Sequence, residues 1–439
     1  MMTHRSRAFL VLAAALGLAA CGRESPTAVG TTLLPAGGVR TFELILDAPD
    51  FLVSDTAASG FVFPINASFE IVAESYGDSV SAHVLGRFVT PSVTISVRDT
   101  ATNSATTDTA RYVNGRVVLY VDSTASNPQP VDLQLYRTTQ QWDALTASWT
   151  MAVDSGSTHV PWTQAGGTVG TLVSSAHYAP GDDSVVFSVD SATIVAWGDT
   201  LNPARGALIR AVSAGTRLRA TSMGYFVNAH GKKVRPDTTV TVTPGLLGAT
   251  FIYTPQAPRR AGTLQLGGVP AWRSFLTFNP AMATRSFTCP ANLGSCTYTL
   301  RDVTINYAAL LLQPLPSGAF APEDSIRPSS WVLSSATTLP LIRTPLGAHV
   351  GTVEPAFAPS AFIGSNLARV AVPITGFVAT LAGDTATAVG KGLTSNTMAL
   401  EQAPEPSLFG VVAFGGRNSG ATAPKLRLII TLGSEVQLP

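Results

Sequence analysis

Charge is scarce in this sequence. Only 13% of the 439 residues are charged, about half the usual share in soluble proteins, and lysine occurs four times. The formal net charge is +1, and no basic run stands out along the chain. Proteins that bind nucleic acid carry a basic patch that neutralises phosphates, so nucleic acid is not expected as a partner. The 45% apolar share is large enough to bury real cores, which excludes a disordered polymer.

Catalytic and metal-binding motifs are missing as well. The six histidines are scattered, and none has the His-Glu-x-x-His spacing of a zinc hydrolase. The nucleophile motifs Gly-x-Ser-x-Gly and Ser-x-x-Lys are absent. Asp182, Asp183 and Asp190 lack the dense alternating carboxylates of a dedicated calcium loop, so we interpret them as solvated loop residues, with calcium as the alternative. The sequence therefore predicts no catalytic residue, no cofactor and no metal.

Long apolar runs are also absent. The run at residues 8–20 is 13 residues long, whereas a transmembrane helix needs roughly 20. Arg5 and Arg7 precede it, and Leu-Ala-Ala-Cys closes it at Cys21. This pattern resembles the signal peptide and lipobox of bacterial lipoproteins. The resemblance implies that residues 1–20 are removed and that Cys21 carries lipid.

The lipid on Cys21 predicts where the protein resides. Two or three acyl chains on one residue anchor a protein to a membrane stably. Gly22 takes the place of the Asp that favours retention in the inner membrane, so we expect the outer membrane, with its periplasmic or outer face left open. Residues 21–38 are small and polar and predict a flexible tether. The alternative is an ordinary secretory signal with a chance cysteine.

The remaining two cysteines, Cys289 and Cys296, enclose a short loop. Pro290, Asn292 and Gly294 are turn formers that can bring the two sulfurs together. An exported protein meets an oxidising compartment, so we predict a disulfide. Free thiols and a metal site are the alternatives, and the metal site would be incomplete because no histidine lies nearby.

Apolar and polar residues alternate with period two along much of the chain. Residues 93–98, 131–135 and 425–431 are examples, and no helical stripe follows the signal peptide. Strands with one buried and one wet face are typical of antiparallel sheets. The sequence thus predicts an all-β protein built from antiparallel, jelly-roll-like β-sandwiches.

The chain also repeats itself at a separation of about 185–190 residues. The paired segments are 83–88 with 273–278, 111–120 with 303–312, 198–200 with 383–385, and the closing strands 239–243 with 425–431. We interpret this order as a duplication. It predicts a first sandwich module at 39–243, a linker at 244–263 and a second module at 264–439.

The order of segments in the first half resembles a known family. A Val-Val-Leu-Tyr strand lies at 117–120, paired tryptophans follow at 142–149, and a segment ending in Trp197 follows at 189–197. This series is similar to the DNRLRE-type domains of secreted bacterial proteins, which are β-sandwiches with carbohydrate-binding members. The resemblance covers about 40–243, whereas 264–439 matches loosely, and the hexapeptide that names the family is absent from both halves.

Three tryptophans, Trp142, Trp149 and Trp162, are the candidate ligand-binding residues. Flat rings stack on the apolar faces of sugars, although packing in the core is the competing interpretation. We expect a non-catalytic, lipid-anchored protein of the envelope or cell surface. It would serve as a binding or structural module, with polysaccharide or an envelope protein as its partner. A polysaccharide-directed enzyme is one alternative, because paired carboxylates leave no sequence spacing. An accessory subunit of an envelope assembly or export machine is another.

Overall fold

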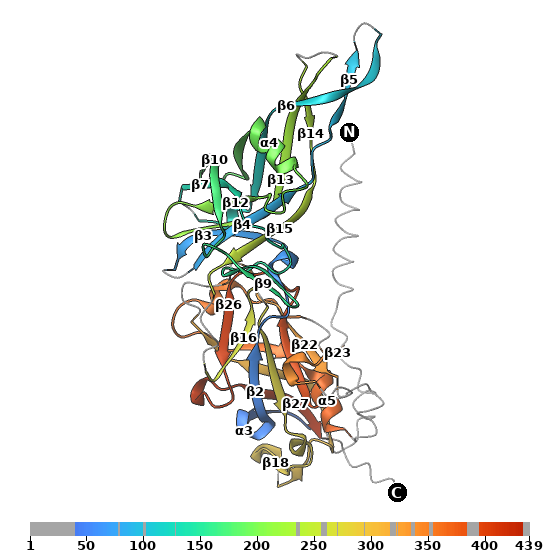
Figure 1. Ribbon diagram of the computed structural model, residues 1–439. Helices are drawn as coiled ribbons and strands as arrows, with labels where there is room; N and C mark the ends of the chain where they lie inside the picture. The colour runs from blue at the N-terminus through green and yellow to red at the C-terminus, as the bar shows by residue number, and fades with distance from the viewer. Residues whose placement is uncertain are drawn as a thin grey trace, which may run out of the picture.

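The structure is a computed structural model, and it is all-β, as predicted (Figure 1). Several antiparallel sheets pack around hydrophobic cores, and the residues that the structure describes include three short α-helices. The signal peptide, Cys21 and the tether lie outside the described residues. The structure describes residues 40–77, 80–99, 102–127, 129–233, 238–255, 261–269, 271–293, 295–316, 322, 324–334, 339–350, 354–383 and 395–432.

Alternation of side chains explains the strands. In β11 (Ser184–Asp190), Val185, Phe187 and Val189 are buried, and the residues between them face outward. Successive side chains of a strand point to opposite faces, so this pattern gives the strand one dry and one wet side. The strand is therefore an element of an antiparallel sheet that is half exposed to water.

The largest sheet has eleven strands and occupies the upper part of Figure 1. It encloses a core that includes Phe88, Trp197 and Tyr225, whose rings contact one another. Its strands are β10 (Val169–Tyr178), β7 (Val131–Thr138), β12 (Ala207–Ala211), β4 (Val80–Phe88), β3 (Glu70–Tyr76), β13 (Thr216–Gly231), β6 (Ser104–Val121) and β11, with β14 (Val240–Val242), β15 (Leu246–Tyr253) and β5 (Thr94–Asp99) paired at their sides.

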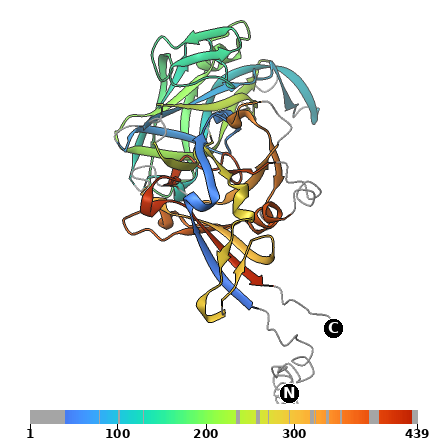
Figure 2. The same ribbon diagram turned by 90° about the horizontal axis from the view of Figure 1, so that it is seen from below.

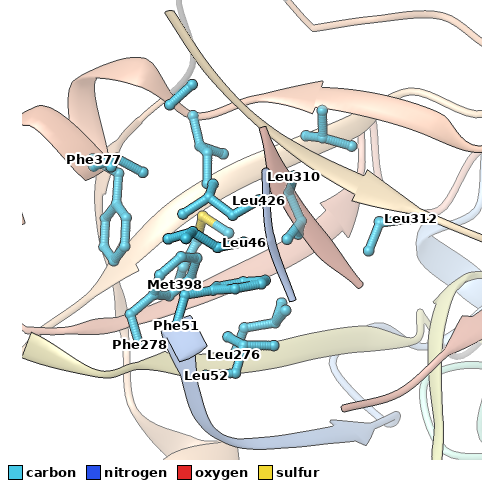
Figure 3. Close-up of a cluster of buried hydrophobic side chains, with 14 of the residues drawn as sticks. Leu46, Phe51, Leu52, Leu276, Phe278, Leu310, Leu312, Phe377, Met398 and Leu426 are labelled. Atoms are coloured by element: carbon cyan, nitrogen blue, oxygen red, sulfur yellow. The ribbon is translucent and has the colours of Figure 1, made fainter. Parts of the chain in front are cut away.

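A second group of sheets lies below the first. One sheet has the order β2 (Leu52–Ala58), β17 (Arg273–Phe278), β25 (Thr397–Gln402), β22 (Pro328–Leu333), β23 (Leu346–His349). Another has the order β1 (Arg40–Asp47), β27 (Lys425–Leu432), β20 (Val303–Leu312), β24 (Val370–Pro373), and a third has β16 (Thr263–Gly267), β26 (Val411–Gly415), β21 (Pro314–Leu315). Figure 3 shows the core between them, where side chains from both larger sheets meet.

The helices and small hairpins complete the fold. The helices are α3 (Ala48–Phe51), α4 (Ser191–Gly198) and α5 (Thr375–Ala382). The hairpins are β8 (Met151–Ser155) with β9 (Thr158–Pro161), and β18 (Phe287–Thr288) with β19 (Thr297–Tyr298). The 3-10 turns are η1 (Pro64–Asn66), η2 (Ser123–Ala125), η3 (Pro280–Ala283), η4 (Ala291–Leu293), η6 (Leu341–Arg343), η7 (Pro359–Phe362) and η8 (Gly420–Thr422).

The predicted start of the first module, at residue 39, is wrong. Strand β1 pairs along its whole length with β27, from Arg40 opposite Leu432 to Asp47 opposite Lys425 (Figure 2). Strand β2 pairs with β17. The chain therefore begins within the sheets of the C-terminal half, builds the eleven-stranded sheet, and returns. Alternation along β1 shows which face is buried, and it carries no information about which distant strand is the partner.

The predicted linker at 244–263 is also corrected. Strand β15 occupies most of its first half and pairs with β4 through seven residues of β4. Phe251 and Ile252 are completely buried, Phe251 in the core that the large sheet encloses and Ile252 in the smaller cluster on its outer face. Residues 256–260 lie outside the described part of the chain. The apolar content of 251–253 therefore marks an integral strand of the N-terminal half.

The two halves share a set of strand pairings that follows the sequence repeat. In chain order, the strands β4, β6, β7, β10, β11, β12 and β13 of the N-terminal half correspond to β17, β20, β22, β23, β24, β25 and β27 of the C-terminal half. With this correspondence, the N-terminal pairs β4–β12, β7–β12, β7–β10, β6–β11 and β6–β13 recur as β17–β25, β22–β25, β22–β23, β20–β24 and β20–β27. A helix follows the edge strand in each half, α4 after β11 and α5 after β24. The strand equivalent to β27 is β13, so the predicted pairing of residues 239–243 with 425–431 is wrong.

The predicted disulfide is confirmed. Cys289 and Cys296 are bonded, with their Cα atoms 5.3 Å apart. The backbone N–H of Cys289 donates to the carbonyl of Cys296 at 2.9 Å, which closes the loop between β18 and β19. The crosslink thus fastens a small hairpin at the lower end of the molecule in Figure 1.

Candidate functional site

Two of the three predicted tryptophans are core residues. Trp142 is 2% exposed and Trp162 is 6% exposed, and both pack against the outer face of the large sheet. The guanidinium of Arg87 lies 4.6 Å from the ring centre of Trp142. The indole N–H of Trp162 donates to the carbonyl of Ser148 at 2.8 Å. Neither ring presents an exposed face for a ligand, so both pack in the core, which corrects their assignment as ligand-stacking residues.

Trp149 is different, because it is only partly buried and lines a cleft. The cleft has a volume of about 630 Å³ and lies where the two halves of the fold meet. The loops at 59–64 and 146–150 and the end of β15 form most of its walls. Trp272, the residue immediately before β17, contributes a second tryptophan that was not predicted from the sequence. Pockets of small-molecule ligands typically span about 300–1,000 Å³, so the cleft falls within that range.

The ring of Trp149 is held from behind by His83 and Gly166. The His83 ring centre lies 4.9 Å from that of Trp149, and His83 Nδ1 lies 2.5 Å from the Gly166 carbonyl oxygen. Burial lowers the pKa of His83, so the neutral imidazole is favoured. Gly166 has a φ of +85°, and a Cβ there would lie 2.8 Å from Trp149. This position therefore requires glycine, both for its backbone and for the space that the indole fills.

Tyr253, Phe251 and Phe409 connect the cleft to packing between the two halves. Tyr253 lines the cleft, and its hydroxyl donates to the carbonyl of Val269. The ring of Phe409 lies 5.7 Å from Tyr253 and 6.4 Å from Phe251. Val269 and Phe409 come from the C-terminal half, yet both are buried in the core of the N-terminal half. The cleft walls are therefore fixed by apolar contacts that join the halves.

The polar groups of the cleft are mostly hydroxyls. Ser59, Thr146, Ser148 and Thr150 line it, together with one carboxylate, that of Asp154. Asp154 lies 2.5 Å from Nδ1 of the exposed His159. A glycosidase uses two facing carboxyl groups, and the lining of this cleft provides one. The arrangement is therefore suited to binding a ligand through aromatic faces and hydroxyl groups.

A cluster of charged side chains lies behind the Trp272 wall. We call Arg273, Glu401 and Glu405 the Arg273 cluster. Arg273 Nη2 lies 2.7 Å from a Glu405 oxygen, and its Nε lies 3.2 Å from both Glu405 and Glu401. The Glu401 and Glu405 side chains are 12% and 9% exposed. Burial, and next the charge of Glu405, raise the pKa of Glu401 to about 7, although Arg273 opposes them.

The predicted loop aspartates have local structural roles. Asp190 accepts a hydrogen bond from the backbone N–H of Thr193 at 2.8 Å and caps α4. The Thr193 side chain, and next this backbone N–H, lower the pKa of the Asp190 carboxyl. Asp182 accepts from the backbone of Ala179 at 2.8 Å. Within the part of the chain that the structure describes, no group of three or more His, Cys, Asp or Glu side chains is arranged to hold a metal ion.

No protein-family model matches the chain, and no curated protein matches it in sequence. The resemblance to DNRLRE-type domains and to lipoproteins therefore stays a prediction from the residues quoted above. None of the helices among the described residues is long and apolar enough to span a membrane. A fold alone does not specify a function, so the chemistry of the cleft is the basis for the functional assignment.

Proposed function

We propose that this chain is a non-catalytic envelope protein, anchored to the outer membrane by lipid on Cys21, and that its cleft binds a polysaccharide segment. The supporting observation is the pair of partly buried tryptophans, Trp149 and Trp272, that line one cleft of about 630 Å³. Aromatic rings provide large apolar faces at little entropic cost, and sugar rings carry apolar C–H faces of similar size.

The surroundings of Trp149 favour binding by a preformed site. His83 and Gly166 hold the ring from behind, so little freedom is lost when a ligand stacks on it. A site that is rigid before binding gives up less entropy on association. The hydroxyls of Thr146 and Ser148 lie beside the ring in the same wall, where they can exchange hydrogen bonds with sugar hydroxyls.

The location follows from the N-terminal residues. Residues 21–38 separate the lipid on Cys21 from β1, the first described strand. A tether of this composition lets a binding module reach ligands near the membrane. No observation in the cleft favours the predicted alternatives, a polysaccharide-directed enzyme and an accessory subunit of an envelope machine.

A binding assay with residues 39–439 tests the proposal. We expect retention on at least one polysaccharide of a glycan panel, and a loss of about tenfold or more in affinity for Trp149→Ala and for Trp272→Ala, as is common for buried aromatic contacts in binding sites. Tyr120→Ala is the matched control, because Tyr120 is a partly exposed aromatic residue on β6 outside the cleft. Lack of retention on every polysaccharide, or binding as tight as that of the wild type by both tryptophan variants, would contradict the proposal.

A further inference from the structure

The Arg273 cluster is joined to two walls of the cleft. Arg273 directly follows Trp272, which lines the cleft. Its guanidinium also stacks on Phe61, 4.3 Å from the ring centre, and the neighbours Gly60 and Val62 line the same cleft. A displacement of this guanidinium therefore acts on Trp272 and on the 59–64 loop together.

A third connection runs through the segment that contains Glu405. Two residues further on, the carbonyl of Ser407 accepts a hydrogen bond of 3.4 Å from Arg219 of the large sheet. Phe409 then packs against Tyr253, another residue of the cleft wall. The ion pair between Arg273 and Glu405 thus fixes the start of a segment whose end supports the cleft.

Several charged and polar groups face Glu401 from the elements around it. Arg273 comes from β17, Glu405 from the following segment, and Ser329 is its cross-strand neighbour on β22. The remaining groups are Trp331 on β22, His349 at the end of β23 and Glu354, with His349 within 3.0 Å of Ser329 and 3.5 Å of Glu354. Glu401 and Glu405 therefore share the Arg273 guanidinium, with the charge of Glu354 acting on Glu401 as well, and a proton on Glu401 relieves the repulsion among these carboxylates.

We propose that Arg273, Glu401 and Glu405 are positioning residues of the aromatic cleft, which hold Trp272 and the 403–409 segment in the binding arrangement while Glu401 is protonated. When Glu401 ionises, Arg273 has to serve two carboxylates, and its pairing with Glu405 weakens. Trp272 and the 403–409 segment, which this pairing holds in place, then open more often. This inference rests on the proposed binding function, and it adds regulation of the same site by pH.

The sign of the pH dependence follows from the direction of the shift. Because the folded-state pKa of Glu401 is raised to about 7 from an ordinary value of 4.5, the protonated carboxyl stabilises the fold fully below about pH 4.5. That contribution is lost as pH rises through 7. We therefore expect the cleft walls to open less often at pH 6 than at pH 8. A single ionisation near pH 7, fully coupled to the opening, changes its equilibrium by about tenfold over this range.

Hydrogen exchange of the mature protein, residues 21–439 in detergent, tests the proposal without a ligand. We expect amides of 403–409 to exchange about tenfold faster at pH 8 than at pH 6, after correction for intrinsic chemistry. Glu401→Gln should keep slow exchange at both values. Glu405→Gln should also remove the difference between pH 6 and pH 8, because Arg273 then pairs with Glu401 alone. Glu43→Gln, which breaks an exposed pair with Arg427, is the matched control.

Equal exchange at both pH values in the wild type, or a difference that persists in Glu401→Gln, would overturn the proposal. The polysaccharide assay, repeated at pH 6 and pH 8, gives the second readout. His159 pairs with the cleft residue Asp154 and lies outside the Arg273 cluster, so His159→Gln should leave the difference between pH 6 and pH 8 intact. If no polysaccharide binds while exchange depends on Glu401, the binding function fails and the positioning role of the cluster stands.

Discussion

Phe51→Ala distinguishes the observed strand pairing from a division of the chain into consecutive modules. Phe51 ends α3, between β1 and β2, and is completely buried, with its ring 5.6 Å from that of Phe278. Truncation of a buried phenylalanine to alanine costs about 3–5 kcal/mol, because apolar contacts are lost and a cavity remains. Entire domains are stable by only about 5–15 kcal/mol, so this loss is large.

The expected effect is confined to the C-terminal half. A loss of about 3–5 kcal/mol makes amides that exchange through opening of that half about a hundred- to several-thousand-fold less protected. Hydrogen exchange read by mass spectrometry should show this in β17, β25 and β27, with little change in β6 and β13. Phe187→Ala is the matched control, since Phe187 is equally buried in the other core and should give the reverse pattern. Loss of protection in β6 and β13 on Phe51→Ala would refute the assignment of residues 40–58.

Three further predictions concern single residues. Cys289→Ser should lower the free energy of unfolding of the β18–β19 hairpin region by about 2.5 kcal/mol, the chain-entropy value for so short a loop. Denaturation of the wild type and the variant measures this difference, and an unchanged midpoint would contradict it. Gly166→Ala should weaken polysaccharide binding as Trp149→Ala does, because the new methyl group displaces the Trp149 indole. Gly156 also has a positive φ but lies in open space, so Gly156→Ala should bind polysaccharide normally in the same assay. Cys21→Ser should release the protein into the soluble fraction, and a variant that stayed in the membrane would show that the lipid anchor is not there.

Much of the local structure could be predicted from the residues alone. Period-two alternation is a property of the strand itself, so Val185, Phe187 and Val189 mark β11 without knowledge of its neighbours. The repeat appeared as similar segments, and the same strand pairings recur in both halves. The disulfide between Cys289 and Cys296 also depends on a short loop with turn-forming residues, and for that reason it too was predictable.

The candidate site could be predicted only in part. Trp149 was among the three tryptophans singled out, but nothing in their local sequences separates it from Trp142 and Trp162, which are buried. Trp272 was missed because it stands alone in the sequence. The carboxyl groups of Glu401 and Glu405 became notable only because both lie beside one guanidinium that is distant in sequence.

Period-two alternation and turn-forming residues were enough to identify many of the strands, the buried side of each, and the two cysteines that form the disulfide. The tertiary structure decided that residues 40–58 belong with the C-terminal half, that Trp149 and Trp272 share a cleft, and that a raised pKa arises at Glu401. The physical reason is that backbone hydrogen bonds are alike for all strands, so a strand's pattern does not identify its partner. Exposure of a ring and ionisation of a carboxyl depend on what packs around them, and here those neighbours come from distant parts of the chain.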